Sequence, residues 1–170
     1  MEYREGQIGR VFVARLDHQD DLLEKIKELA KKEQITTGIF WAIGALQHAT
    51  LVKGPQKDEL PPLPVKESFQ GARELLGTGT VMWDEYDKAG ACNYNHTTDK
   101  GDIEDKSENT GPQIHLHGTT GGRDGLTTGC LREHAEVYIT VEVILLEISG
   151  LEAFRGMDPH AGLKLLSFRR

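Results

Sequence analysis

The stretch from residue 111 to residue 132 constrains the fold more than any other part of this sequence. It consists of two short strand-like runs joined by a glycine-rich connection from Gly118 to Gly125. The Asp124-Gly125 pair at the end of that connection is a strong hairpin signal, because the tight turns that join neighbouring strands need positive φ angles. The sequence therefore predicts two antiparallel strands that lie side by side here.

The rest of the chain also favours strands, with one helix near the start. Leu22, Ile26 and Leu29 recur at helical spacing within the segment 20–33, and charged residues fill most of the other positions. This pattern predicts an amphipathic helix that packs on a sheet. Six further segments have the β-branched, aromatic or apolar content of strands: 8–16, 35–45, 46–53, 67–84 (as one strand or two), 136–148 and 162–168.

Two segments between these elements are expected to be loops. Residues 54–66 contain four prolines, which makes them too stiff for regular structure. Residues 85–111 are polar, acidic and rich in Gly, Asn and Asp. So long a stretch without periodicity is either a mobile insertion or a functional loop, which here would act as a flap over the hairpin.

The composition indicates one domain, residues 1–170. No apolar run approaches the ~20 residues that a membrane span needs, and the first residues lack a secretory pattern, so a cytoplasmic location is the default expectation. The formal net charge is −7. Because nucleic-acid binding depends largely on Lys and Arg neutralising phosphates, this charge counts against DNA binding, although a local basic patch could suffice.

His115 and His117 are the leading candidates for chemistry. Side chains alternate along a strand, so both point to one face, roughly 6.5–7 Å apart at a rise of ~3.3 Å per residue. Two imidazoles at this spacing can converge on one cation, and Cys130 on the neighbouring strand can add a thiolate. With only Cys92 besides it, metal or thiol chemistry is favoured over a disulfide. The alternative is two polar residues on a solvated or inter-subunit strand face.

Two imidazoles and a thiolate favour Zn²⁺ over Cu, Ni or Fe²⁺. Three protein ligands leave a fourth position open for a water molecule of lowered pKa, which can attack a carbonyl or phosphoryl group. His134, four residues after Cys130, is a candidate fourth ligand, and so are His96 and Cys92 from the long loop. If one of them binds the metal, the site is closed and structural.

A hydrolytic site would also need a general base, for which Glu133, Glu136 and Glu142 are equal candidates on sequence alone. Metal-dependent hydrolysis of a small molecule is therefore the first hypothesis for any enzymatic activity. His48, a lone histidine in the segment 46–53, is expected to be a packed or surface residue rather than a ligand.

At this point the chain resembles a known family, the plants-and-prokaryotes-conserved (PPC) domain. In plants this domain follows AT-hook motifs in DNA-binding proteins, and in bacteria and archaea it occurs as a stand-alone protein. The resemblance covers nearly the whole chain, including the helix after the first strand. It rests on the motifs Ala42-Ile43-Gly44-Ala45-Leu46, Ile114-His115-Leu116-His117, Arg123-Asp124-Gly125, Gly129-Cys130-Leu131 and Glu136-Val137.

The resemblance implies an α/β (α+β) domain with a mostly antiparallel sheet, one or two flanking helices and a homotrimeric assembly. It also implies a metal held by His115, His117 and the side chain at position 130. Many members carry His at that position, whereas this chain carries Cys130. The competing implication is a trimeric module that recruits proteins or contacts DNA, although the Arg-Gly-Arg core of an AT-hook is absent here.

Overall fold

The computed structural model describes residues 1–85 and 111–169 of the chain. These residues form one helix and a strand-rich framework around it. The elements in chain order are β1 (Gln7–Asp17), α1 (Leu22–Lys32), β2 (Thr37–Pro55), β3 (Pro64–Trp83), β4 (Pro112–Gly122), β5 (Gly125–Ser149), β6 (Ala153–Asp158) and β7 (Leu163–Phe168).

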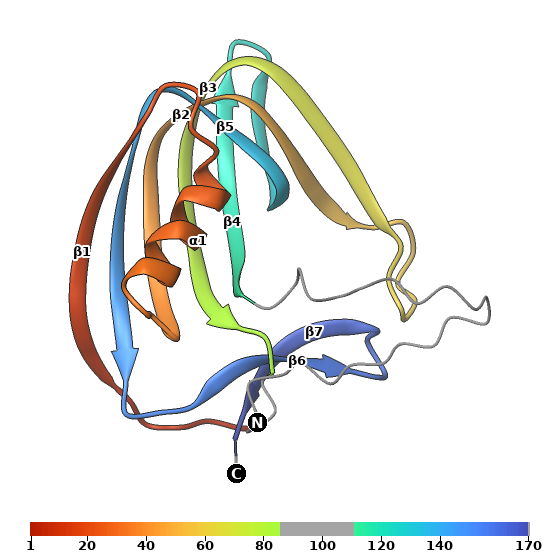
Figure 1. Cartoon of the computed structure of the whole chain (residues 1–170). Coiled ribbons are helices and arrows are strands. Elements are labelled where there is room, and N and C mark those ends of the chain that lie inside the picture. Colours follow the sequence, from red (N-terminus) through yellow and green to blue (C-terminus); the bar gives the residue numbers. More distant parts are fainter. Residues whose placement is uncertain (86–110, 170) are drawn as a thin grey trace, which may run out of the picture.

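The main sheet has five antiparallel strands in the order β1-β5-β2-β3-β4. β5 also pairs with β4, so that Leu131 lies opposite Leu51 of β2 on one side and opposite Leu116 of β4 on the other. The strands β2, β3, β4 and β5 therefore form a closed ring, which removes the exposed edge of β4. Figure 1 shows the sheet curving around α1, with the β6–β7 hairpin at its base.

The helix forms where the spacing of apolar residues predicts it. Asp21 caps its N-terminus by accepting hydrogen bonds from the backbone N–H groups of Leu23 and Glu24, at 2.9 and 3.0 Å. Leu22 and Ile26 are buried against the inner face of the sheet. The predicted fold class, a mostly antiparallel sheet with a packed helix, is thus confirmed. The described residues contain one helix.

The core lies between α1 and the concave face of the sheet. Phe40 of β2 and Leu116 of β4 are fully buried in it. Gly79 of β3 lies between these two residues in the register. A Cβ atom at Gly79 would lie only 2.4 Å from Cζ of Phe40, so the aromatic ring fills the space that the glycine leaves. Because Leu116 points inward, its neighbours on β4 point outward.

Some strands are longer than the sequence patterns predict. The predicted strands 35–45 and 46–53 are both parts of β2, because Gly44 at φ +146° bends the chain without ending the sheet pairing. The second strand of the hairpin likewise continues through 136–148 as the 25-residue β5. The segment 67–84 is one strand, β3, whose pairing with β2 already begins at Pro64.

The C-terminal part differs most from the prediction. The predicted strand 162–168 exists as β7, but it pairs with β6, which the mixed composition of that segment did not predict. Most of the loop predicted at 85–111 lies outside the described residues. In the part of the chain that is described, no helix is both long and apolar enough to cross a membrane.

Candidate metal centre

The outward-facing side of β4 carries His115 and His117. β4 is held between β3 and β5, so that His117 lies opposite Cys130 of β5 and opposite Thr78 of β3. His115 lies opposite Thr80 of β3 in the same way. Because directly opposite residues share a face of the sheet, the two histidines and the cysteine project to the same side.

The possible ligand atoms of His115, His117 and Cys130 all lie within 4.8 Å of one another. The two Nε2 atoms of the histidines are 3.0 Å apart, and their rings meet edge to face at 77°. Tetrahedral Zn²⁺ with Zn–N distances near 2.0–2.1 Å needs its nitrogens about 3.3 Å apart. The two imidazoles would therefore separate by only a few tenths of an ångström to hold zinc. Together with the nearby thiol, the chemistry of the donor set fits the ion that the sequence favours.

Two guanidinium groups lie beside these three residues. Nε of Arg132 donates a hydrogen bond to Sγ of Cys130 at 3.1 Å, and the cysteine is only 4% exposed. Arg155 of β6 is 9% exposed and donates from Nη2 to the hydroxyl of Thr80 at 2.7 Å. A buried cation is costly unless an anion or a polar group accompanies it, and Asp84, which pairs with Arg155 in an isolated β-bridge, supplies part of that compensation.

The electrostatics favour a neutral ring at His115. Burial is the main cause that lowers the pKa of His115 from 6.5 to about 4, and the charges of Arg155 and Arg132 and the neighbouring His117 add to the effect. Burial also lowers the pKa of Arg155. At neutral pH the imidazole of His115 is therefore uncharged, which is the form that binds metals.

The structure does not bring the candidate fourth ligands to the group formed by His115, His117 and Cys130. His134 lies in a separate group with His48 and Glu136, whose ligand atoms are also within 4.8 Å of one another. Cys92 and His96 lie outside the described residues.

The candidate general bases are also distributed over the sheet. Glu133 forms an ion pair with Lys66, and Glu142 lies opposite Ile43 of β2 and Arg15 of β1. Glu136 belongs to the separate histidine group. The charged side chains that act on His115 are those of Arg155 and Arg132, not these carboxylates.

Sequence reasoning did not place Arg155 near the candidate ligands, and it treated His48 as a packed or surface residue rather than as part of a cluster. Arg155 comes from β6, whose composition gave no strand signal. His48 lies on β2, and the pattern of residues around it does not indicate that other ligand side chains lie nearby. A search for all histidines on predicted strands would have kept His48 as a candidate, but not its partners.

These features define a protein with one helix, a curved antiparallel sheet and an outward-facing His–His–Cys group. A comparison with curated protein sequences finds no match. The profile of the Plants and Prokaryotes Conserved (PCC) domain matches residues 3–149. The chain therefore belongs to the PCC domain family, as the motifs predicted.

Solved structures of related fold cover almost the whole chain. A metal-containing protein from Archaeoglobus fulgidus is 26% identical, with 97% of this chain and 98% of that chain covered and a TM-score of 0.73. A plant- and prokaryote-conserved protein from Pyrococcus horikoshii is 24% identical, with 100% and 99% covered and a TM-score of 0.74. A protein from Ralstonia eutropha, provisionally named as DNA-binding, is 20% identical, with 92% and 90% covered and a TM-score of 0.67.

Proposed function

We propose that this PCC domain protein binds a transition-metal ion, zinc in preference to Cu, Ni or Fe²⁺, through His115, His117 and Cys130. The observation that carries the proposal is the mutual approach of the three ligand atoms to within 4.8 Å, from two strands that the sheet holds rigidly. The Archaeoglobus fulgidus neighbour supports it, because that protein is described as metal-containing.

Three protein ligands leave the ion with an open position. The ion would supply Lewis acidity and a bound water of lowered pKa there. Arg132 contacts Cys130, and Arg155 contacts Thr80 opposite His115, so an anionic group next to that position would be favoured, because guanidiniums bind carboxylates and phosphates. A small anionic molecule is therefore the ligand class we propose, and hydrolysis is the first reaction to test.

Metal analysis of protein purified without an affinity tag tests the proposal. We expect at least one equivalent of transition metal per chain, with zinc in the largest amount, because the site offers a donor set typical of zinc. Protein that contains no metal, and that binds none when zinc is added back, would contradict the proposal.

We also propose a homotrimer, as the family resemblance implies. The outward face of the sheet next to His117 carries several large apolar side chains that a single chain leaves exposed, and exposed apolar patches commonly mark interaction surfaces. In the register, Trp41, Thr78, His117 and Cys130 follow one another across four strands, so the metal group and this patch share one face. The apolar residues are Val11, Val13, Trp41, Ile43, Leu76 and Ile144.

Leu76→Glu is expected to dissociate the assembly, because it would bury a carboxylate in an apolar interface. Leu76 is 65% exposed in the single chain, so its fold tolerates the change. Native mass measurement should give three times the mass of one chain for the parent and one chain for the variant. Leu63→Glu, at a position equally exposed but in the loop before β3, is the matched control and should remain trimeric. A monomeric parent protein would refute the trimer.

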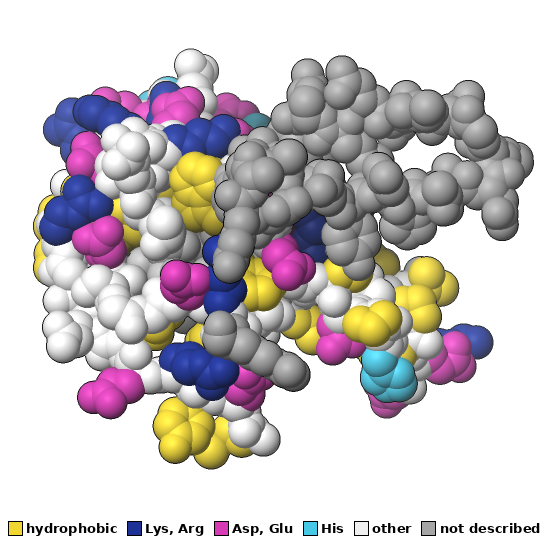
Figure 2. Space-filling view, turned by 60° about the horizontal axis from the view of Figure 1, so that its bottom comes forward, with side chains coloured by type: hydrophobic (Ala, Val, Ile, Leu, Met, Phe, Trp, Pro, Cys, Tyr) yellow, Lys and Arg dark blue, Asp and Glu magenta, His cyan; other side chains and the backbone are white. Residues whose placement is uncertain are grey.

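DNA binding is the alternative function. The provisional name of the Ralstonia eutropha neighbour is its support. The net charge of −7 opposes it. On the face that Figure 2 presents, Lys and Arg side chains are also interspersed with Asp and Glu. A gel-shift assay over a range of salt concentrations tests it, and a lack of retardation at low salt would exclude this function.

A further inference from the structure

A second group of possible metal ligands lies on the same outward face as His115 but at a different place. It consists of His48 of β2 and of His134 and Glu136 of β5, with ligand atoms within 4.8 Å of one another. Val52, four residues beyond His48 on β2, lies opposite Cys130. At a rise of ~3.3 Å per residue, the two groups are therefore roughly 13 Å apart along β2, so they are separate sites.

An irregularity in the sheet brings the three residues together. Leu46 pairs with Val137 and His48 pairs with Glu136, so Gln47 is an extra residue on β2 and forms a β-bulge. Strict alternation from the buried Leu46 would turn the side chain of His48 into the core. The bulge turns it outward instead, onto the same face as Glu136. Bulges of this kind often re-aim a side chain at a functional site.

Hydrogen bonds hold the ligands in place. Nδ1 of His134 lies 2.9 Å from a carboxylate oxygen of Asp21, while its Nε2 lies 3.4 Å from Oε2 of Glu136. The side-chain amide of Gln47 donates to the other oxygen of Glu136. A carboxylate on the far nitrogen of a histidine is the arrangement that fixes the ring and strengthens it as a metal ligand.

Asp21 is itself fixed in position. One of its carboxylate oxygens caps α1, and the other accepts a hydrogen bond from the backbone N–H of Ala135 at 3.1 Å. The ring of His48 approaches that of His134 with 4.8 Å between centroids. The side chains of Asp21 and Glu136 are about three-quarters shielded from solvent, so the group is preorganised rather than a set of free surface side chains.

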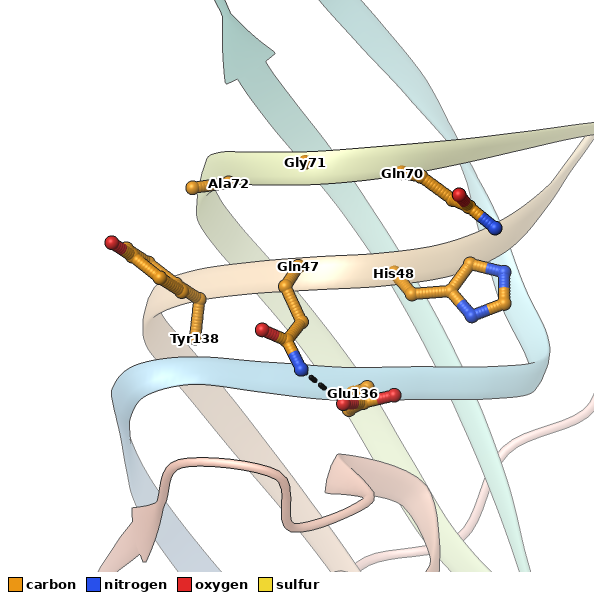
Figure 3. Close-up of a pocket in the computed structure, with 7 residues that line it drawn as sticks. All are labelled: Gln47, His48, Gln70, Gly71, Ala72, Glu136 and Tyr138. Atoms are coloured by element: carbon orange, nitrogen blue, oxygen red, sulfur yellow. Dashed lines mark hydrogen bonds between the residues drawn. The ribbon is translucent and has the colours of Figure 1, made fainter.

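An open cavity of about 540 Å³ adjoins this group. Figure 3 shows His48 and Gln70 directed to one end of it, and Gln47 directed towards Glu136. Amide and phenol groups, rather than apolar side chains, supply much of the lining. The lining residues are Gln47, His48, Gln70, Gly71, Ala72, Glu136 and Tyr138.

We propose that His48, His134 and Glu136 form a second metal site, for a divalent transition-metal ion such as Zn²⁺ or Fe²⁺. Two imidazoles and one carboxylate are a donor set used for both ions when coordination positions remain open for a substrate. His48 and Glu136 line the cavity, whose amide groups would suit a small polar ligand beside the ion. This proposal does not depend on metal binding by Cys130.

Titration of metal-free, tag-free protein with Co²⁺ separates the two sites. Among the residues that the structure describes, Cys130 is the one thiol, so the site that contains it is the one expected to produce a thiolate-to-cobalt charge-transfer band in the near ultraviolet. We expect the parent protein to bind two equivalents per chain. Glu136→Gln and His48→Ala should each bind one equivalent and keep the band, whereas Cys130→Ala should bind one equivalent without it.

Asp21→Asn provides a matched variant that tests the orienting role of this carboxylate. Asn caps helices about as well as Asp, so α1 should remain intact, while the side-chain nitrogen of Asn replaces the oxygen that accepts from Ala135 and lies against His134. The negative charge beside His134 is lost, and we expect the affinity of the second site to fall by roughly 10- to 100-fold while the charge-transfer band is unchanged. Circular dichroism confirms that each variant is folded. If the folded Glu136→Gln and His48→Ala variants bind as much Co²⁺ as the parent, the second site is refuted.

Discussion

Cys130→Ser is expected to weaken zinc binding at the His115 site by more than ~100-fold, because loss of a group that merely orients a ligand already costs roughly 10- to 100-fold. Serine keeps the size of the buried side chain, and its hydroxyl can accept the hydrogen bond that Arg132 now donates to sulfur. The change therefore removes the thiolate without opening a cavity. Competition with a chromophoric zinc chelator measures the affinity of each variant, with Glu136→Gln present throughout so that the second proposed site does not contribute.

Thr119→Ala is the matched control for this experiment. Thr119 lies two residues beyond His117 on the same face of β4, and its hydroxyl pairs with that of Thr128 at 2.9 Å. It should bind zinc as the parent does. Thermal unfolding gives a second measurement, because a ligand at 100 times its Kd stabilises the folded state by about 2.7 kcal/mol. Zinc binding by Cys130→Ser at the parent affinity would show that Cys130 is not a ligand.

Phe40→Ala is expected to lower the free energy of unfolding by about 3–5 kcal/mol, the usual cost of removing a large buried aromatic side chain. Phe40 is fully buried, and its ring fills the space above Gly79. Gly79 has no side chain that could move into the cavity that the missing ring would leave. Since domains are stable by only about 5–15 kcal/mol in total, this single change would remove a large part of the stability.

Urea unfolding followed by circular dichroism measures this effect. Leu126→Ala serves as the control, because Leu126 is 80% exposed and its truncation should change the free energy of unfolding by no more than about 0.5 kcal/mol. A cost below about 1 kcal/mol for Phe40→Ala would mean that the core relaxes around the cavity, contrary to the rigid packing against Gly79.

The position of the hairpin turn shows how much of the β4–β5 pairing the local sequence predicts. Asp124-Gly125 predicts a turn here, and the structure has one. However, Gly122 pairs with Gly125, and the positive φ of 114° falls on Gly125, so Arg123 and Asp124 form the loop. A turn centred on Asp124 and Gly125 would shift the register by two residues, and Cys130 would then lie opposite Thr119 instead of His117.

The strands are also longer than the local sequence patterns predicted. The segments 35–45 and 46–53 were predicted as separate strands, but Gly44 does not end the strand, because both halves of β2 continue to pair with β5. The β6 strand was not predicted at all, and with it the contact of Arg155 with Thr80 was missed. That contact depends on a β6–β3 approach that no local periodicity encodes.

The sequence by itself determined the family, the helix, the strand-rich class and the common face of His115 and His117. These properties follow from short-range rules, since the alternation of side chains and the spacing of apolar residues are written in neighbouring positions. Tertiary structure alone decided which side chains from distant strands meet. His48 joins His134 and Glu136 only because β2 lies beside β5 and bulges at Gln47, and such long-range pairing leaves no trace in the residues around His48.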